Sequence, residues 1–191
     1  MELRKVVESL SHWVIGSKTS SVHDTKTLRR NDSAAPWVVL VLASGFGAGY
    51  APIAPGTAGT LVAIPIYYFL SFIPFPLYEL TILTFFFFSS WIAERAQGYW
   101  QKRDDRRIVI DEMMGYFLTM LWVPRTVLFI VLGFLLFRLF DVVKPPPIRL
   151  LEKARGGYGV VLDDVLAGVY SNIVLQIISC FALSPGGRGG G

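Results

Sequence analysis

Long uncharged stretches alternate with short charged segments along this chain. No charged residue or histidine occurs in residues 37–77, 80–93 or 165–187. A helix of about 20 apolar residues crosses a bilayer, so these lengths predict integral membrane segments. The alternative is a soluble helical bundle with a very apolar core. That alternative stays open because several stretches contain Pro or Gly and the helices expected around 113–137 are short.

The same pattern predicts an all-α membrane bundle. The segment 37–57, WVVLVLASGFGAGYAPIAPGT, is rich in Gly and Pro, which disfavour a continuous helix. We therefore expect a short helix followed by a re-entrant loop. Two helical hairpins and a final helix should follow, at about residues 58–75 and 78–101, then 113–124 and 126–143, then 164–181. Strand signals are weak, and no repeat of fixed period is visible.

The two ends of the chain differ in composition from the centre. Residues 1–35 are polar and basic and contain no apolar region typical of a secretory signal. We expect a flexible arm there, with a loose amphipathic surface helix over residues 1–16. Residues 184–191, SPGGRGGG, predict a disordered Gly-rich tail. The chemistry is expected in one domain, residues 36–183.

Composition narrows the classes of partner. The chain of 191 residues is 53% hydrophobic and only 17% charged, which is unusual for a soluble globule. Its formal net charge is +4. The basic clusters border apolar segments and are not interleaved with stacking aromatics, so we expect anionic lipid headgroups and no nucleic acid as partner. A lone Cys180 excludes an intramolecular disulfide and a cysteine-based zinc cluster.

The distribution of basic residues predicts an orientation in the membrane. Lys and Arg are frequent in the N-terminal arm and in the segment 98–110. The positive-inside rule therefore places both on the cytoplasmic side, with an even number of crossings between them.

Two acidic pairs precede apolar helices. Asp111 and Glu112 open DEMMGYFLTM, and Asp163 and Asp164 open DDVLAGVYSN. Carboxylates at helix N-termini have a purely structural explanation, because they cap free N–H groups and suit the helix dipole. Four carboxylates brought together would instead repel one another unless a cation lies among them. Oxygen ligands without His or Cys favour Mg²⁺.

The segment FRLFDVVKPPPIR, residues 137–149, places charges in an apolar helix. Arg138 and Asp141 are i,i+3 neighbours, and Lys144 lies near the same face. A structural ion pair and a lysine reaching the membrane surface would explain them. Ionisable groups within a membrane are nevertheless functional candidates by default. We expect Arg138 and Lys144 to bind phosphate, with Arg149 as a weaker candidate, and Asp141 to be a catalytic carboxylate that meets the Mg²⁺ ion.

A Gly-rich loop adds a weaker signal. The segment GFGAGYAPIAPGTAGT, residues 45–60, precedes a predicted helix and could present backbone N–H groups to phosphate. It is not a Walker A loop, because no Lys follows the glycines. Thr57 and Thr60 at its end are candidate phosphate-binding residues. Glycine and proline also suit a re-entrant turn, and that explanation stays open.

These motifs together resemble the phosphatidylglycerophosphatase A family of bacterial membrane lipid phosphatases. The resemblance rests on GFGAGYAPIAPGTAGT, IVIDEMMG, FRLFDVVKPPPI and GGYGVVLDDVLAGV, and it covers about residues 36–183. It implies a Mg²⁺-dependent enzyme that converts phosphatidylglycerophosphate to phosphatidylglycerol. It also implies an all-α bundle with one central helix surrounded by others, in the bacterial cytoplasmic membrane. A homo-oligomer is compatible with it.

The site expected from the residues and the resemblance has two parts. The catalytic set is Asp111, Glu112, Arg138, Asp141, Lys144, Asp163 and Asp164, of which the two acidic pairs would hold the metal. We expect a metal-activated water as nucleophile, and an aspartyl-phosphate on Asp141 or Asp164 is the alternative.

Two other functions compete with this hypothesis. A lipid phosphotransferase of the CDP-alcohol type is also a Mg²⁺ enzyme of the membrane, but DDVLAGVYSN lacks its second Asp pair and its Arg. A small transporter would need ionisable groups along a pathway through the bilayer, whereas here they gather near one predicted face.

Overall fold

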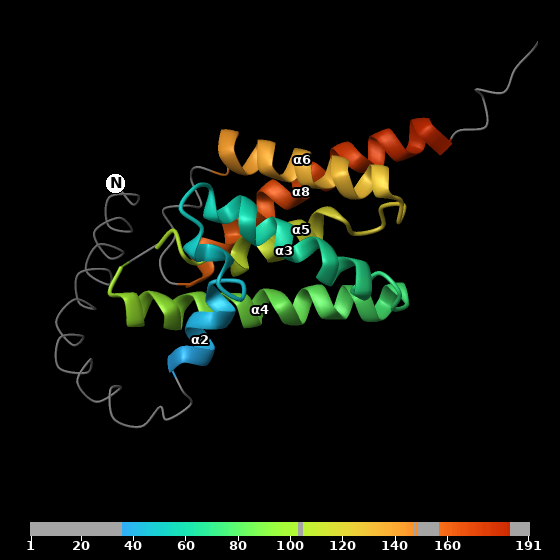
Figure 1. The fold of residues 1–191 in the computed structure, drawn as a ribbon. Helices are drawn as coiled ribbons and strands as arrows, with labels where there is room; N and C mark the ends of the chain where they lie inside the picture. Colours follow the sequence, from blue (N-terminus) through green and yellow to red (C-terminus); the bar gives the residue numbers. More distant parts are fainter. Residues whose placement is uncertain (1–35, 103–104, 147, 149–156, 184–191) are drawn as a thin grey trace, which may run out of the picture. The chain divides into compact units, whose positions relative to one another are not determined.

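The computed structural model describes residues 36–102, 105–146, 148 and 157–183 of the chain. Every secondary-structure element in these ranges is helical, which confirms the predicted all-α class. In chain order they are α2 (Pro36–Ala43), the 3₁₀ turn η1 (Ala48–Tyr50), α3 (Pro55–Leu70), α4 (Phe75–Trp100), α5 (Ile110–Thr119), α6 (Val127–Val143) and α8 (Gly157–Leu183) (Figure 1). The expected arm, surface helix and Gly-rich tail lie outside the described residues.

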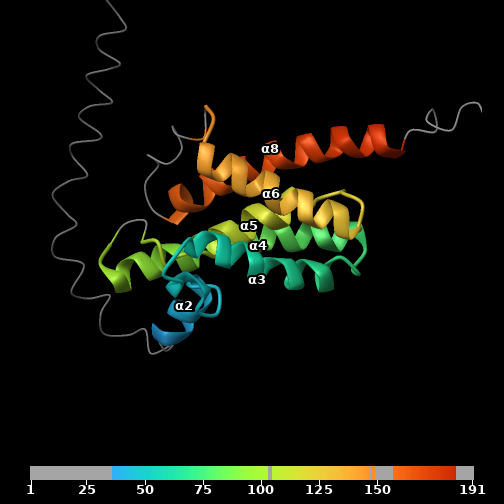
Figure 2. The same cartoon turned by 45° about the horizontal axis from the view of Figure 1, so that its top comes forward.

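Helix α5 is the central element. It packs against α3, α4, α6 and α8, and both views show it between α4 on one side and α6 and α8 on the other (Figures 1 and 2). Eight of its ten residues are buried, and Tyr116 is completely enclosed. The prediction of a central helix surrounded by others is therefore confirmed.

Prolines determine where the first hairpin turns. Helix α3 ends at Leu70, five residues earlier than the pattern predicted. Ser71 closes it by donating its backbone N–H to the Tyr67 carbonyl at 2.7 Å. Pro74 then disfavours a helical conformation for the residue before it. Pro76 lies in the first turn of α4, where the missing N–H costs nothing.

Side chains from α8 stabilise the end of α5. The helix ends at Thr119 and not near Pro124 as expected. Carbonyl groups at a helix C-terminus lack intrahelical partners. Asn172 donates to the carbonyls of Thr119 and Leu121 at 2.9 and 2.7 Å, and Gln176 donates to that of Leu121 at 3.0 Å. These bonds provide partners for carbonyls that lack one within α5, and they link α5 to α8.

Helix α8 begins earlier than the sequence suggested. The expected start was Asp164, whereas the helix starts at Gly157. The prediction that Asp163 and Asp164 open this helix was therefore wrong. The sequence reading placed the start of α8 later because glycine has a low helix propensity and Gly157 and Gly159 lie in its first turn. Tertiary packing overrides that preference. Both carboxylates lie in the second turn, so capping of free N–H groups does not explain them.

Two glycines allow α5 and α8 to approach closely. A Cβ atom on Gly168 of α8 would lie 2.5 Å from the carbonyl oxygen of Gly115 in α5. A Cβ atom on Gly115 would lie 2.6 Å from the carbonyl oxygen of Asp164 and would also meet the ring of Phe137. The two backbones are thus in direct contact one turn from Asp164, and this contact sets where Asp164 lies relative to the start of α5.

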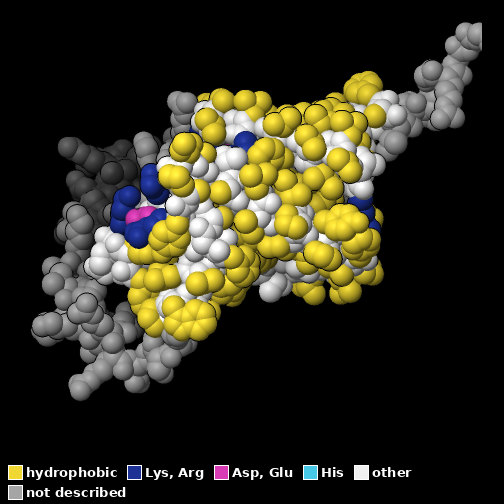
Figure 3. All heavy atoms as spheres, in the orientation of Figure 1, with side chains coloured by type: hydrophobic (Ala, Val, Ile, Leu, Met, Phe, Trp, Pro, Cys, Tyr) yellow, Lys and Arg dark blue, Asp and Glu magenta, His cyan; other side chains and the backbone are white. Residues whose placement is uncertain are grey.

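The outer surface of the bundle is largely apolar. Hydrophobic side chains cover most of the described face in Figure 3, and the exposed ones include Phe69, Leu128 and Phe181. Helices α4 and α8 are long and apolar enough to cross a bilayer. An 18-residue stretch of each has a mean hydropathy of 1.3 in α4 and 1.8 in α8. Such a surface is favourable in lipid and costly in water. The protein is a membrane protein.

Candidate active site

Eight charged residues of the bundle line one cavity of about 200 Å³. It lies between the first turns of α3 and α5, the end of α6, the second turn of α8 and the loop before α5. Its lining is Ala54, Pro55, Gly56, Arg106, Ile108, Asp111, Glu112, Arg138, Asp141, Lys144, Val160, Asp163 and Asp164. Figure 3 shows a group of Lys, Arg and acidic side chains at one end of a largely apolar face.

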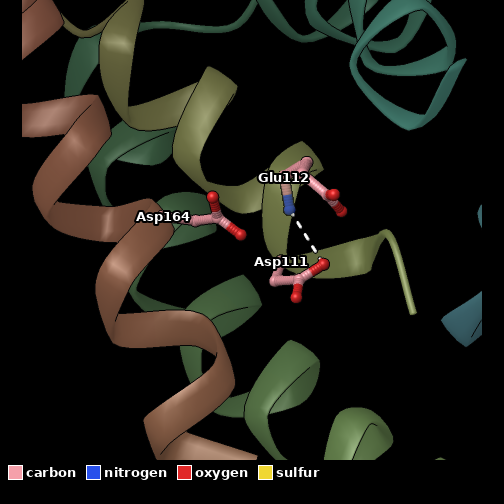
Figure 4. A group of neighbouring side chains, drawn as sticks. All are labelled: Asp111, Glu112 and Asp164. Atoms are coloured by element: carbon pink, nitrogen blue, oxygen red, sulfur yellow. Dashed lines mark hydrogen bonds between the residues drawn. The ribbon is translucent and has the colours of Figure 1, made fainter. Parts of the chain in front are cut away.

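Three carboxylates meet at the base of this cavity. Asp111 and Glu112 come from the first turn of α5, and Asp164 comes from α8 and points toward them (Figure 4). One oxygen from each lies within 4.8 Å of the other two. Asp111 and Asp164 are only 5% and 4% exposed. We call this set the acidic trio.

The acidic trio fits a hard divalent cation. The Oε2 of Glu112 and the Oδ1 of Asp164 are buried without a hydrogen-bond partner among the described residues. Asp111 accepts a hydrogen bond of 3.0 Å from the Glu112 backbone N–H (Figure 4). Buried carboxylates without donors are costly unless a cation or a proton neutralises them. An oxygen-only set of this kind suits Mg²⁺.

The electrostatics of the trio agree with this reading. Burial raises the pKa of Glu112 to about 8; the carboxylates of Asp164 and Asp141 add to the rise, while a hydrogen bond with Asp111 and the charge of Arg138 oppose it. Burial, followed by the charge of Glu112, raises the pKa of Asp111 well above its usual range. Without a cation these carboxyl groups therefore hold their protons more readily than exposed ones, and a bound cation would favour their ionised forms.

Two ion pairs also line the cavity. Arg138 donates from Nη1 to Oδ2 of Asp141 at 2.6 Å, one turn along α6. Lys144, which ends α6 in a left-handed conformation with φ 46°, donates from Nζ to Oδ2 of Asp163 at 2.8 Å. Both cations line the same cavity as the acidic trio. Asp163 lies outside the trio, so the structure brings three of the four predicted metal ligands together and pairs the fourth with Lys144.

The remaining predicted residues are placed differently. Thr57 and Thr60 do not line the cavity. Thr60 is fully buried, and its hydroxyl donates to the Gly56 carbonyl at 3.0 Å within α3. Arg149 lies outside the described residues. From the Gly-rich loop, the first turn of α3 reaches the site through Gly56.

Two of the cavity residues that sequence reasoning did not single out bear on its chemistry. Gly56 lies against Glu112 and Arg138, because a Cβ atom there would collide with Oε1 of Glu112 and approach Nη1 of Arg138 to 3.1 Å. The position of Gly56 in the Gly-rich motif pointed to this site. The motif was interpreted only as a source of backbone N–H groups for phosphate, and the close packing against Gly56 was not foreseen. Arg106 also lines the cavity. Its charge served only to orient the chain, and no motif identified it.

Comparison with known proteins agrees with this site. The family model described as phosphatidylglycerophosphatase A matches residues 41–179, which include all residues of the cavity. Proteins named phosphatidylglycerophosphatase A from Escherichia coli K12 and Haemophilus influenzae Rd are 37% and 34% identical over 145 and 149 residues. These alignments each cover 75% of this chain, and 83% and 90% of the relatives.

A third relative has a different name. A Bacteroides thetaiotaomicron protein named "Putative phosphatidylinositol-3-phosphatase" is 40% identical over 146 residues, which cover 72% of this chain and 91% of that protein. No solved structure matches the chain.

Proposed function

We propose that this chain, which belongs to the phosphatidylglycerophosphatase A family and is a phosphoric monoester hydrolase, removes the terminal phosphate of phosphatidylglycerophosphate with the help of Mg²⁺. One observation carries the proposal beyond family membership. An oxygen-only acidic trio lines the same cavity as Arg138 and Lys144. A phosphate bound there would meet the charges of both cations and, once a metal is present, that of the metal.

Asp111, Glu112 and Asp164 would hold the metal. Bound Mg²⁺ would supply positive charge to the phosphate oxygens and make a nearby water more acidic. Asp163 and Asp141 have other partners, since they pair with Lys144 and Arg138. We therefore assign these two carboxylates to orient the cations and not to bind the metal.

The residues of the chain itself would perform three tasks. Arg138 presents planar donors, and Lys144 a point charge, to the oxygens of the transferring phosphoryl group. Stabilising charge on that group is the largest requirement of phosphoryl transfer. Asp141 is a carboxylate of the cavity outside the trio, with its side chain 15% exposed, and is our candidate for the base that takes the proton of the attacking water.

Location in the membrane follows from the same arrangement. The charged cavity lies at the end of the bundle where α3 and α5 begin and α6 ends (Figure 1). The basic segment before α5 contributes Arg106 to that end. By the positive-inside rule, we propose a multi-pass protein of the bacterial cytoplasmic membrane whose cavity opens on the cytoplasmic face.

The name of the Bacteroides thetaiotaomicron relative suggests a second lipid substrate to test, phosphatidylinositol 3-phosphate. Phosphatidylinositol 3-phosphate and phosphatidylglycerophosphate both carry a phosphomonoester on a headgroup that a phosphodiester joins to diacylglycerol. The relative with the phosphatidylinositol-3-phosphatase name is the 40% identical one. Phosphatidylinositol 3-phosphate is therefore our second candidate substrate.

Purified protein in mixed micelles tests both substrates and the metal. We expect phosphate release from phosphatidylglycerophosphate, loss of activity in excess EDTA, and recovery when Mg²⁺ exceeds the chelator. Equal turnover in EDTA would refute the metal assignment. Faster turnover of phosphatidylinositol 3-phosphate at matched surface concentration would replace the first candidate by the second.

A further inference from the structure

The cavity contains a third cation that the catalytic arrangement does not use. Arg106 lies in the loop between α4 and α5, lines the cavity and is exposed. Arg138 and Lys144 are each bound to a carboxylate. Arg106 makes no ion pair or side-chain hydrogen bond within the part of the chain that the structure describes. An exposed cation in this position can bind an anionic group of a ligand that enters the cavity.

The nearest carboxylate in sequence is occupied by other residues. Asp105 accepts two hydrogen bonds from the guanidinium of Arg107, at 2.8 and 3.0 Å, and pairs with Lys102 at 3.8 Å. The Arg107 guanidinium also stacks on Trp100, 4.4 Å from the ring centroid. Consecutive arginines thus have separate roles. Arg107 folds back on α4, whereas Arg106 faces the cavity.

The loop that presents Arg106 is firmly held. Ile108 and Val109 are buried, at 3% and 0% exposed. The Ile108 N–H donates to the Asp105 carbonyl, and the Val109 N–H donates to the Ala43 carbonyl at the end of α2, both at 2.8 Å. Fixed backbone on both sides reduces the entropy lost when Arg106 binds a ligand.

The polar side chains of the cavity lining, within the described part of the chain, are all charged. Three of them are the cations Arg106, Arg138 and Lys144. Headgroups can therefore be distinguished here by the number and position of their anionic groups. The proposed substrate has two, the terminal monoester and a phosphodiester one glycerol unit away.

We propose that Arg106 binds the phosphodiester of the lipid while Arg138 and Lys144 bind the terminal phosphate. The inference rests on the proposed function. It makes Arg106 a specificity residue that favours headgroup phosphomonoesters over phosphatidic acid, whose single phosphate is the monoester itself. Because the diester does not react, its contact has the same strength in the bound substrate and in the transition state, so it lowers KM and leaves kcat unchanged.

The test compares two lipids in mixed micelles containing Mg²⁺. We expect Arg106→Gln to raise KM for phosphatidylglycerophosphate about 10- to 100-fold, the usual effect of losing a hydrogen bond to a charged group. Its kcat, and its kcat/KM for phosphatidic acid, should stay within about twofold of wild type. Lys102→Gln is the matched control. It removes one positive charge from the same loop, outside the cavity, on a side chain that is 60% exposed.

Product inhibition gives a second readout that does not need turnover of phosphatidic acid. Phosphatidylglycerol keeps the diester and lacks the monoester, so Arg106→Gln should raise its inhibition constant by a similar factor. An equal loss on both lipids, a loss shared by Lys102→Gln, or an unchanged KM and inhibition constant would each overturn the assignment. Failure of the proposed function would look different, because wild-type protein would then not hydrolyse phosphatidylglycerophosphate.

Discussion

The contact between α5 and α8 offers the sharpest test of how the fold positions the site. In Gly168→Ala, the new Cβ atom would lie 2.5 Å from the Gly115 carbonyl oxygen, and ordinary contact begins at 3.4 Å. The helices must therefore separate by about 0.9 Å at this point. Overpacking of this kind costs about 1–3 kcal/mol of stability. Because Asp164 lies one turn away, its carboxylate moves relative to Asp111 and Glu112.

A displacement near 1 Å at a catalytic site can lower turnover on the order of 100-fold. We expect Gly168→Ala to lose activity by about this factor and to unfold at lower temperature in detergent, measured by phosphate release and thermal denaturation. Gly98→Ala in α4 is the control, since no atom lies within 4 Å of its Cβ position. It should keep full activity. Wild-type activity and stability in Gly168→Ala would refute the claim that this backbone contact sets the spacing of the acidic trio.

Two further predictions concern the cations and the trio. We expect a loss of kcat of about 100- to 1000-fold in each of three single variants, Arg138→Ala, Asp141→Asn and Lys144→Ala, while the protein still inserts in membranes. Near-wild-type phosphate release by the Arg138→Ala, Asp141→Ala double variant would show that this pair is only structural. In metal-free protein, stability should fall as pH rises from about 4.5 to about 8, because Glu112 ionises near 4.5 in the unfolded chain and near 8 in the folded one. Thermal denaturation in EDTA across this range measures the fall, saturating Mg²⁺ should remove it, and a flat profile without metal would contradict it.

The sequence predicted best what depends on local periodicity. Helix α6 ends at Val143 as expected, because an apolar run stops at Lys144 and three prolines. The pairing of Arg138 with Asp141 also follows from helical spacing, since residues three apart share a face. The presence of Asp111 and Glu112 in the first turn of α5 was also predicted correctly, because they directly precede an apolar run and acidic residues favour helix N-termini.

Features that depend on tertiary contacts were not predictable from the pattern. Lys144 and Asp163 are nineteen residues apart in sequence and meet only because α8 packs beside α6. The end of α5 depends on amide side chains supplied by α8, which no local signal near Thr119 reveals. Arg106 and Arg107 look equivalent in sequence, and only the position of Asp105 and Trp100 separates their roles.

The two ion pairs of the cavity have a consequence for the end of the reaction cycle. A phosphate bound by Arg138 and Lys144 shares these cations with Asp141 and Asp163, which pair with them in the structure. Each carboxylate remains attached beside its cation and competes with the bound product at very high local concentration. Free phosphate should therefore leave readily and inhibit weakly.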